Sequence, residues 1–149
     1  MNSIGPTNSA SFWAIGASTF HHLGFVVGSI ADAAKDFAES LCANWDAKVI
    51  HDPLQVVRVT FLRPRTPQNP VVELIEPAGD KSPVLGFLKR GGGLHHLCYE
   101  VEGLEKQLQV ARSIGMLVTR PPQPAVAFGG RRIAWVYTKH RLLLELLEK

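Results

Sequence analysis

Cysteine is scarce in this sequence: Cys42 and Cys98 are the only two among 149 residues. A chain of this length can bury enough apolar surface to fold without covalent cross-links, so we expect both to be free thiols. Apolar runs are also short, far below the roughly 18–20 residues that span a bilayer. The first residues lack the basic region and long apolar core of a secretion signal. We therefore expect a cytoplasmic protein with no membrane partner.

A strong excess of one charge is missing too. Sixteen Lys and Arg face thirteen Asp and Glu, a formal net charge of +3, and no block of five like charges occurs. This mild excess suits a small anionic substrate but is too weak to predict nucleic-acid binding. With 46% hydrophobic residues, the composition is typical of one globular domain or of two half-domains that share a core.

The order of predicted elements is the same in the two halves of the chain. Residues 1–18 are rich in Ser, Asn, Gly and Ala, and we expect them to form an N-terminal arm outside the core. After it, periodicity predicts a strand, a helix capped by Ser29 and three more strands, at 20–27, 30–43, 47–51, 56–62 and 71–76. A short helix with Ser82 as its cap and Pro83 at its first position should follow. The second half then predicts a strand, a helix and three strands, at 94–101, 104–114, 116–119, 132–137 and 142–147.

The two halves also share sequence motifs. His21-His22-Leu23 matches His95-His96-Leu97, 74 residues later, and Arg58-Val59-Thr60-Phe61 matches Arg132-Ile133-Ala134-Trp135 at the same distance. Val71-Val72-Glu73 likewise matches Leu143-Leu144-Glu145. Motifs repeated in one order indicate an internal duplication. We therefore predict an α+β fold, a single domain at 19–149 built from two tandem βαβββ modules, 19–78 and 93–148, joined by a short helix. Their strands should form a curved, partly open sheet around a central cleft.

Four polar residues recur inside the apolar strands of this repeat: His22 with His96, and Glu73 with Glu145. A buried imidazole or carboxylate is costly without a partner, and equivalent residues converge when two modules pair. Two nitrogen and two oxygen ligands suit one divalent ion, and Zn, Co, Ni, Mn and Fe all accept such a set. The sequence therefore predicts a metal site at His22, Glu73, His96 and Glu145.

Other interpretations of these residues stay open. Each of the four, taken singly, is also typical of a solvated or structural side chain. Strict alternation places His21 and His95 on the opposite face from their neighbours, and either face can point inward. We favour His22 and His96 because Gly24 and Cys98 leave room on their face for a ligand. Glu100 is a candidate for supporting the site from outside the ligand set.

The sequence resembles the vicinal oxygen chelate superfamily over residues 20–148. The motifs HHLGFVV and GGGLHHLCYEV open the two modules, and VVELIEP and LLLELLE close them. This superfamily includes glyoxalase I, extradiol dioxygenases and methylmalonyl-CoA epimerase. The resemblance is strongest to the epimerases, through the segment VELIEPAGDKSPVLGFLKRGGGLHHLCYEV. It implies a glyoxalase-like fold and a homodimer, and it places the family's metal ligands on the same four residues.

The function implied by this resemblance is proton transfer next to a carbonyl. It would be a divalent-metal-dependent, epimerase-like isomerase acting on a small anionic substrate such as an acyl thioester, with Glu145 and Glu73 as its catalytic carboxylates. One departure matters, because the epimerases' acidic residue outside the ligand set falls on Leu54. Three alternatives therefore stay open: a glyoxalase I-type lyase, an Fe(II) dioxygenase, and a small-molecule binding or resistance protein without catalysis.

Overall fold

The structure is a computed structural model that describes residues 18–149, so nearly all of the expected arm at 1–18 lies outside the described residues. The first half contains β1 (Thr19–Val26), α1 (Ile30–Ser40), β2 (Ala43–Trp45), β3 (Ile50–Asp52), β4 (Val57–Pro64) and β5 (Val72–Pro77). A short helix, α2 (Leu85–Lys89), links it to the second half. The second half contains β6 (Gly93–Val101), α3 (Leu104–Ser113), β7 (Leu117–Pro124), the 3-10 turn η1 (Val126–Phe128), β8 (Arg132–Tyr137) and β9 (Leu143–Glu148).

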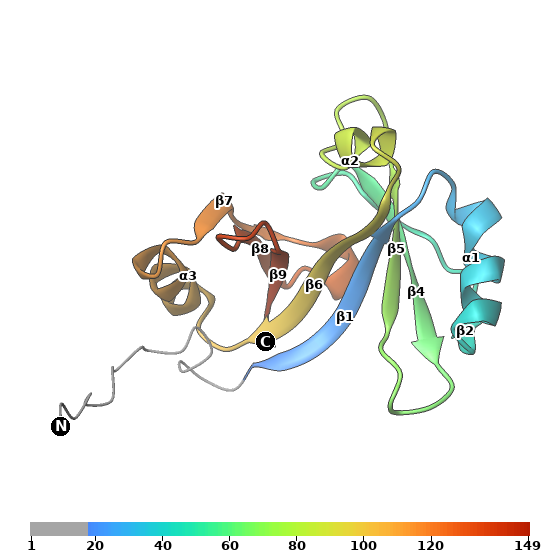
Figure 1. Ribbon diagram of the computed structural model, residues 1–149, viewed down its shortest axis with the longest axis horizontal. Helices are drawn as coiled ribbons and strands as arrows, with labels where there is room; N and C mark the ends of the chain where they lie inside the picture. The colour runs from blue at the N-terminus through green and yellow to red at the C-terminus, as the bar shows by residue number, and fades with distance from the viewer. Residues whose placement is uncertain (1–17) are drawn as a thin grey trace, which may run out of the picture.

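The strands of the described chain form one mixed sheet in the order β2-β4-β5-β1-β6-β9-β8-β7, with β3 paired to β4. Each half uses the same pairings, because β1 is parallel to β5 and β6 is parallel to β9. The halves join where β1 and β6 run antiparallel, side by side at the centre of the molecule (Figure 1). The predicted α+β architecture of two βαβββ units in an open sheet is confirmed.

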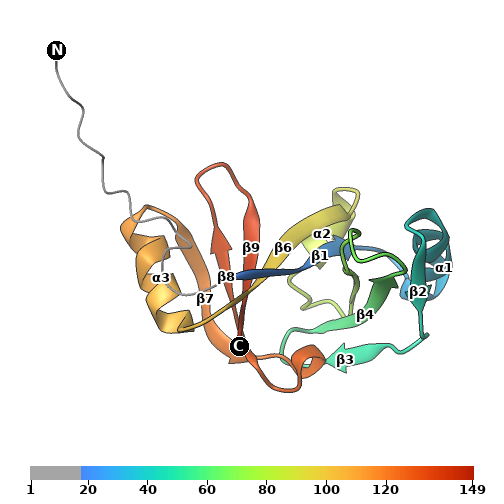
Figure 2. The same ribbon diagram turned by 90° about the horizontal axis from the view of Figure 1, so that it is seen from below.

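The helices α1 and α3 lie at opposite ends of this sheet in both views (Figures 1 and 2). Each packs on the strands of its own half, α1 against Leu62 and Leu74 and α3 against Ala134 and Leu146. These residues alternate with a second apolar set on the other face of the sheet, which is the face shared by the two halves. That second set comprises Val26, Val57, Val59, Ile75, Cys98, Ile133 and Leu147. Strands near the seam are therefore buried on both faces, which leaves their polar residues inside the protein.

The structure differs from the predicted elements at several turns. The strand expected at 47–51 begins only at Ile50, as β3, because Ala47 adopts a left-handed conformation (φ 59°) that an extended chain does not allow. A further short strand, β2, precedes this turn at Ala43–Trp45 and was not predicted. The first helix ends at Ser40 instead of 43, before Cys42, which is also left-handed (φ 50°). The linking helix begins at Leu85, after hydrogen-bonded turns at Ser82, so Pro83 is not its first residue.

The structure also bears on the cysteines and on the short apolar runs of the sequence. Both cysteines are free, Cys42 exposed and Cys98 buried, as predicted. Across residues 18–149, no helix combines the length and the hydropathy that crossing a membrane requires.

Candidate metal centre

The four residues predicted to bind a metal come together on four neighbouring strands, β5, β1, β6 and β9. Glu73 on β5 pairs with Gly24 of β1, and Glu145 on β9 pairs with Cys98 of β6. Across the seam, Gly24 pairs with His96. The exposed fractions of His22, Glu73, His96 and Glu145 are 0, 5, 2 and 3%. The register of the sheet therefore places two imidazoles and two carboxylates in one buried group.

The ligand atoms of this group lie close enough to share one ion. The Nε2 atoms of His22 and His96 are 3.1 Å apart. Glu73 Oε2 lies 3.2 and 3.5 Å from these two nitrogens, and Glu145 Oε2 lies 3.3 and 3.2 Å from them. Bonds of about 2.1 Å to a central ion place neighbouring ligand atoms roughly 3.0–3.4 Å apart. The observed spacing matches this arrangement.

The surroundings of Glu145 also fit a cation. Its Oε2 atom is buried and has no described group in hydrogen-bonding geometry, although it faces both Nε2 atoms. Leaving a buried carboxylate oxygen unsatisfied costs free energy that a bound cation would recover. A donor set of two imidazoles and two carboxylates is one that Zn, Co, Ni, Mn or Fe(II) can occupy. The residues present therefore fit a divalent ion.

Electrostatics point the same way. Burial alone would lower the pKa of His22, but the carboxylates of Glu73 and Glu145 outweigh it and raise that pKa to about 10. Burial would raise the pKa of Glu145, yet its contacts with His22 and His96 hold it well below the usual range. Two carboxylates in so small a volume attract positive charge, either a proton on His22 or a metal ion.

Gly24 provides the space for His96. A Cβ atom at position 24 would lie 2.1 Å from His96 Cε1 and 2.4 Å from its Nδ1. No other residue type fits beside this ring without moving it, because such distances are far inside van der Waals contact. The room for His96 thus comes from its partner strand, since Gly24 and His96 are paired across the seam.

Replacing Gly24 by Ala should therefore destabilise the protein by about 1–3 kcal/mol, the usual cost of overpacking a core. The free energy of unfolding in urea measures this effect. Gly28→Ala is the matched control, because a Cβ atom there meets nothing within 4 Å and the change should cost less than about 0.5 kcal/mol. Equal stability of the two variants would contradict the tight fit at position 24.

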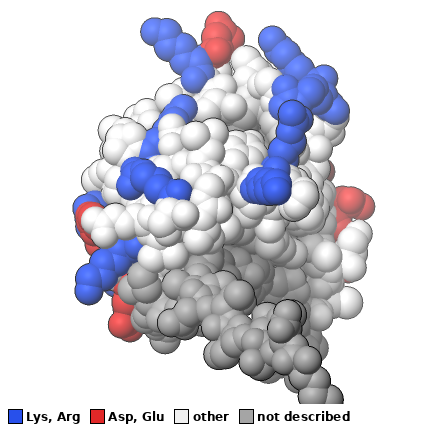
Figure 3. All heavy atoms as spheres, turned by 60° about the vertical axis from the view of Figure 1, so that its left-hand side comes forward, with Lys and Arg blue, Asp and Glu red and all other residues white. Residues whose placement is uncertain are grey.

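A cavity of about 190 Å³ is lined by three of the four residues, Glu73, His96 and Glu145, and is bounded by both halves of the chain. Its walls are mainly apolar and include Val57, Val59, Ile75, Ile133 and Trp135. Polar groups from Gln55, Thr119, Arg120 and Tyr137 also line it. On the face drawn in Figure 3, Lys and Arg side chains are scattered over largely uncharged surface. Among the described residues that line the cavity, Arg120 is the one Lys or Arg.

Asp52 is a lining residue whose role the sequence did not predict. It is 2% exposed, and its Oδ1 accepts hydrogen bonds from the backbone N–H groups of Leu54 and Gln55. Its Oδ2 accepts from the backbone N–H of Val126 at the start of η1. This carboxylate links the first half of the chain to the second, because both of its oxygens accept backbone hydrogen bonds. The contact involves no repeated motif, so nothing in the sequence indicated it.

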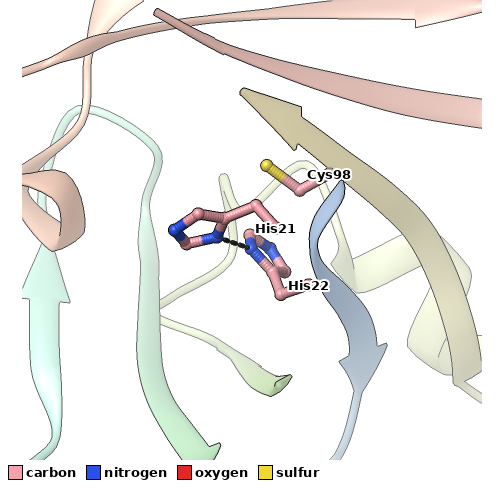
Figure 4. A group of neighbouring side chains, drawn as sticks. All are labelled: His21, His22 and Cys98. Atoms are coloured by element: carbon pink, nitrogen blue, oxygen red, sulfur yellow. Dashed lines mark hydrogen bonds between the residues drawn. The ribbon is translucent and has the colours of Figure 1, made fainter. Parts of the chain in front are cut away.

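A second group of possible ligands, His21, His22 and Cys98, shares one histidine with the first (Figure 4). Burial, followed by the charge of Glu145, raises the pKa of the Cys98 thiol well above its usual value. A protonated thiol is a poor metal ligand. Glu100, which the sequence offered as a supporting residue, instead forms an ion pair with Arg131.

Comparisons with known proteins agree with this architecture. A family model described as "Glyoxalase/Bleomycin resistance protein/Dioxygenase superfamily" matches residues 4–135. The ethylmalonyl-CoA/methylmalonyl-CoA epimerase of Cereibacter sphaeroides is 30% identical over 121 residues, which cover 80% of this chain and 87% of the relative.

Solved structures of epimerases share the fold. Methylmalonyl-CoA epimerase from Mycobacterium tuberculosis aligns with a TM-score of 0.74 at 23% identity, covering 87% of this chain and 86% of that one. A Streptomyces coelicolor methylmalonyl-CoA epimerase variant in complex with 2-nitronate-propionyl-CoA aligns with a TM-score of 0.73 at 21% identity, covering 88 and 94%. From the family model and the 30% identical relative, the chain belongs to the Glyoxalase/Bleomycin resistance protein/Dioxygenase superfamily, the superfamily that its repeated motifs resemble.

Proposed function

We propose that this protein is a metal-dependent, epimerase-type isomerase that removes and returns the proton on a carbon next to a thioester carbonyl. The substrate would be a 2-substituted malonyl thioester such as methylmalonyl-CoA, and His22, Glu73, His96 and Glu145 would hold one divalent ion. The observation that carries this proposal is the convergence of these four side chains beside an apolar cavity. The epimerase names of the relatives support the choice of substrate.

The protein's own residues supply binding and proton transfer in this proposal. Arg120 would bind an anionic group of the substrate, and the apolar wall around Trp135 would exclude water. The bound ion would supply positive charge that makes a proton next to a coordinated carbonyl more acidic. Glu145 is ionised, because its contacts with His22 and His96 hold its pKa well below the usual range, and its side chain lines the cavity. We therefore assign the proton transfer to Glu145, with Glu73 as the second carboxylate.

Deuterium exchange tests the proposal directly. The protein is loaded with Zn²⁺, Co²⁺, Ni²⁺ or Mn²⁺ and incubated with methylmalonyl-CoA in D₂O. The methylmalonyl-CoA should then incorporate one deuterium at its α-carbon, which mass spectrometry measures. Chelation should stop the incorporation and metal addition should restore it, because the α-proton is acidified only in the loaded site. Absence of exchange with every metal would refute the proposed reaction.

A glyoxalase I-type lyase is the second candidate, and the observation that favours it is Leu54. The described acids of the cavity are Asp52, Glu73 and Glu145, and Asp52 accepts three hydrogen bonds from backbone N–H groups. A proton shift in a hemithioacetal needs one base, whereas inversion at a carbon is helped by acids on both faces. If the protein converts a hemithioacetal but incorporates no deuterium into methylmalonyl-CoA, the reaction is that of the lyase instead.

Three further predictions from the sequence belong to this proposal: location, oligomeric state and domain organisation. We propose a cytoplasmic homodimer in which residues 19–149 form one domain. Sedimentation of the purified protein at micromolar concentration measures the oligomeric state, with twice the mass of the 16.3 kDa chain expected.

A further inference from the structure

Each histidine of the metal centre follows another histidine, and these neighbours lie where the pairing of β1 with β6 is irregular. On β1, Phe20 pairs with Tyr99 and His22 with Cys98, so His21 is an extra residue. On β6, the partners of Gly24 and Phe25 are His96 and Leu94, so His95 is an extra residue. A bulge that adds one residue interrupts the alternation of side chains. The same irregularity therefore occurs once in each half, at equivalent positions.

The bulges bring both histidines of each pair onto the same face. The rings of His21 and His22 both pack on Phe128, with ring centroids 5.5 and 5.8 Å away. The rings of His95 and His96 both pack on Trp135, at 6.0 and 4.8 Å. Strict alternation would have placed the members of each pair on opposite faces of the sheet. His21 and His95 therefore lie beside the metal centre as its outer neighbours.

Within each pair, the two rings meet through their Nδ1 atoms. His21 Nδ1 lies 2.8 Å from His22 Nδ1, and Figure 4 shows this contact between adjacent rings of β1. His95 Nδ1 lies 3.0 Å from His96 Nδ1. A hydrogen bond between two ring nitrogens needs one protonated donor and one unprotonated acceptor. The Nε2 atoms of His22 and His96 face the carboxylates and must be unprotonated to bind a metal, so their protons must lie on Nδ1.

We propose that His21 and His95 are positioning residues, whose Nδ1 atoms accept hydrogen bonds from the Nδ1–H groups of His22 and His96. The bond fixes the tautomer and the ring orientation that direct Nε2 of each inner histidine to the ion. Most metal-binding histidines donate this proton to a carboxylate or a carbonyl, whereas here an imidazole accepts it on both sides of the site. This inference rests on the proposed metal centre.

Two variants of His95 separate positioning from simple packing. His95→Leu removes the acceptor, whereas His95→Asn keeps an acceptor oxygen near the place of Nδ1. We expect His95→Leu to weaken Zn²⁺ binding about 10–100-fold, the usual effect of losing such a partner, and His95→Asn to weaken it far less. Competition with a chromogenic chelator measures the Zn²⁺ affinity. Urea unfolding of the metal-free variants shows whether both are folded.

A spectroscopic readout reports the hydrogen bond itself. With histidine labelled by ¹⁵N, the Zn²⁺-loaded wild type should show slowly exchanging Nδ1–H signals for His22 and His96. The signal of His96 should disappear in His95→Leu and persist in His95→Asn. Equal affinities and equal spectra for the two variants would overturn the positioning role while leaving the metal centre in place. A wild-type protein that binds no Zn²⁺ would overturn the metal centre and the inference with it.

Discussion

Replacing His96 by Ala is expected to remove the bound divalent ion and to lower the rate of α-proton exchange by about 10³-fold or more. Its Nε2 atom lies 3.1–3.5 Å from the ligand atoms of the other three residues, so its loss opens one side of the site. A 10³-fold loss corresponds to about 4 kcal/mol of transition-state stabilisation, which is within what a metal ion contributes at a carbonyl. Elemental mass spectrometry and deuterium incorporation measure the two effects.

The matched control for this variant is His140→Ala, because His140 is exposed in the turn before β9. It should bind one ion per chain and exchange the proton at the wild-type rate. One ion per chain in His96→Ala would show that the metal lies elsewhere. A wild-type protein without metal, even after reconstitution, would instead favour a binding protein without catalysis. In that case a ligand should raise the melting temperature of the metal-free chain.

The internal repeat made the architecture and the grouping of the four residues predictable from the sequence. Glu73 and Glu145 occupy equivalent places in strands that are otherwise apolar, and burial on both faces of β5 and β9 explains the spacing of their hydrophobic residues. The choice of His22 over His21 depended on the small residues Gly24 and Cys98, which were expected to leave room for a ligand. The structure shows what Gly24 does, since a Cβ atom at position 24 would overlap the ring of His96.

Features without an equivalent in the other half, or set by local backbone shape, were not predictable. The bulges at His21 and His95 break the two-residue period on which the face assignment depends, so periodicity alone placed these side chains wrongly. The turn at Ala47 delays the start of a predicted strand to Ile50, because a non-glycine residue takes a left-handed conformation there. The link between Asp52 and η1 joins residues 74 positions apart through a backbone N–H, and a backbone group leaves no trace in the sequence.

Installing a second acid is expected to change the stereochemical outcome of the proposed reaction. In the wild type, Glu145 and Glu73 belong to the metal centre and Asp52 is engaged by three backbone N–H groups. With Glu145 as the main base, most protons return to the face from which they came, and a slower transfer involving Glu73 inverts the carbon. We therefore expect wild-type protein to exchange the α-proton of methylmalonyl-CoA faster than it inverts the α-carbon.

Leu54→Glu should raise the rate of inversion by about 10²-fold, the lower end of what a positioned general acid or base contributes. Leu54 is 56% exposed, so a carboxylate there needs no burial, and it lies between Asp52 and Gln55, which both line the cavity. By the resemblance seen in the sequence, the epimerases' acidic residue outside the ligand set would fall at this position. Chiral analysis of methylmalonyl-CoA alongside deuterium incorporation gives both rates from one reaction.

Leu54→Gln is the matched control for this variant, because it has nearly the same shape as the glutamate but cannot carry a proton as an acid or base. It should leave the ratio of inversion to exchange at the wild-type value. If wild-type protein already inverts the carbon as fast as it exchanges the proton, the carboxylates of the metal centre must serve both faces. Glu73 would then be the second acid, and Glu73→Gln should lower inversion more than exchange.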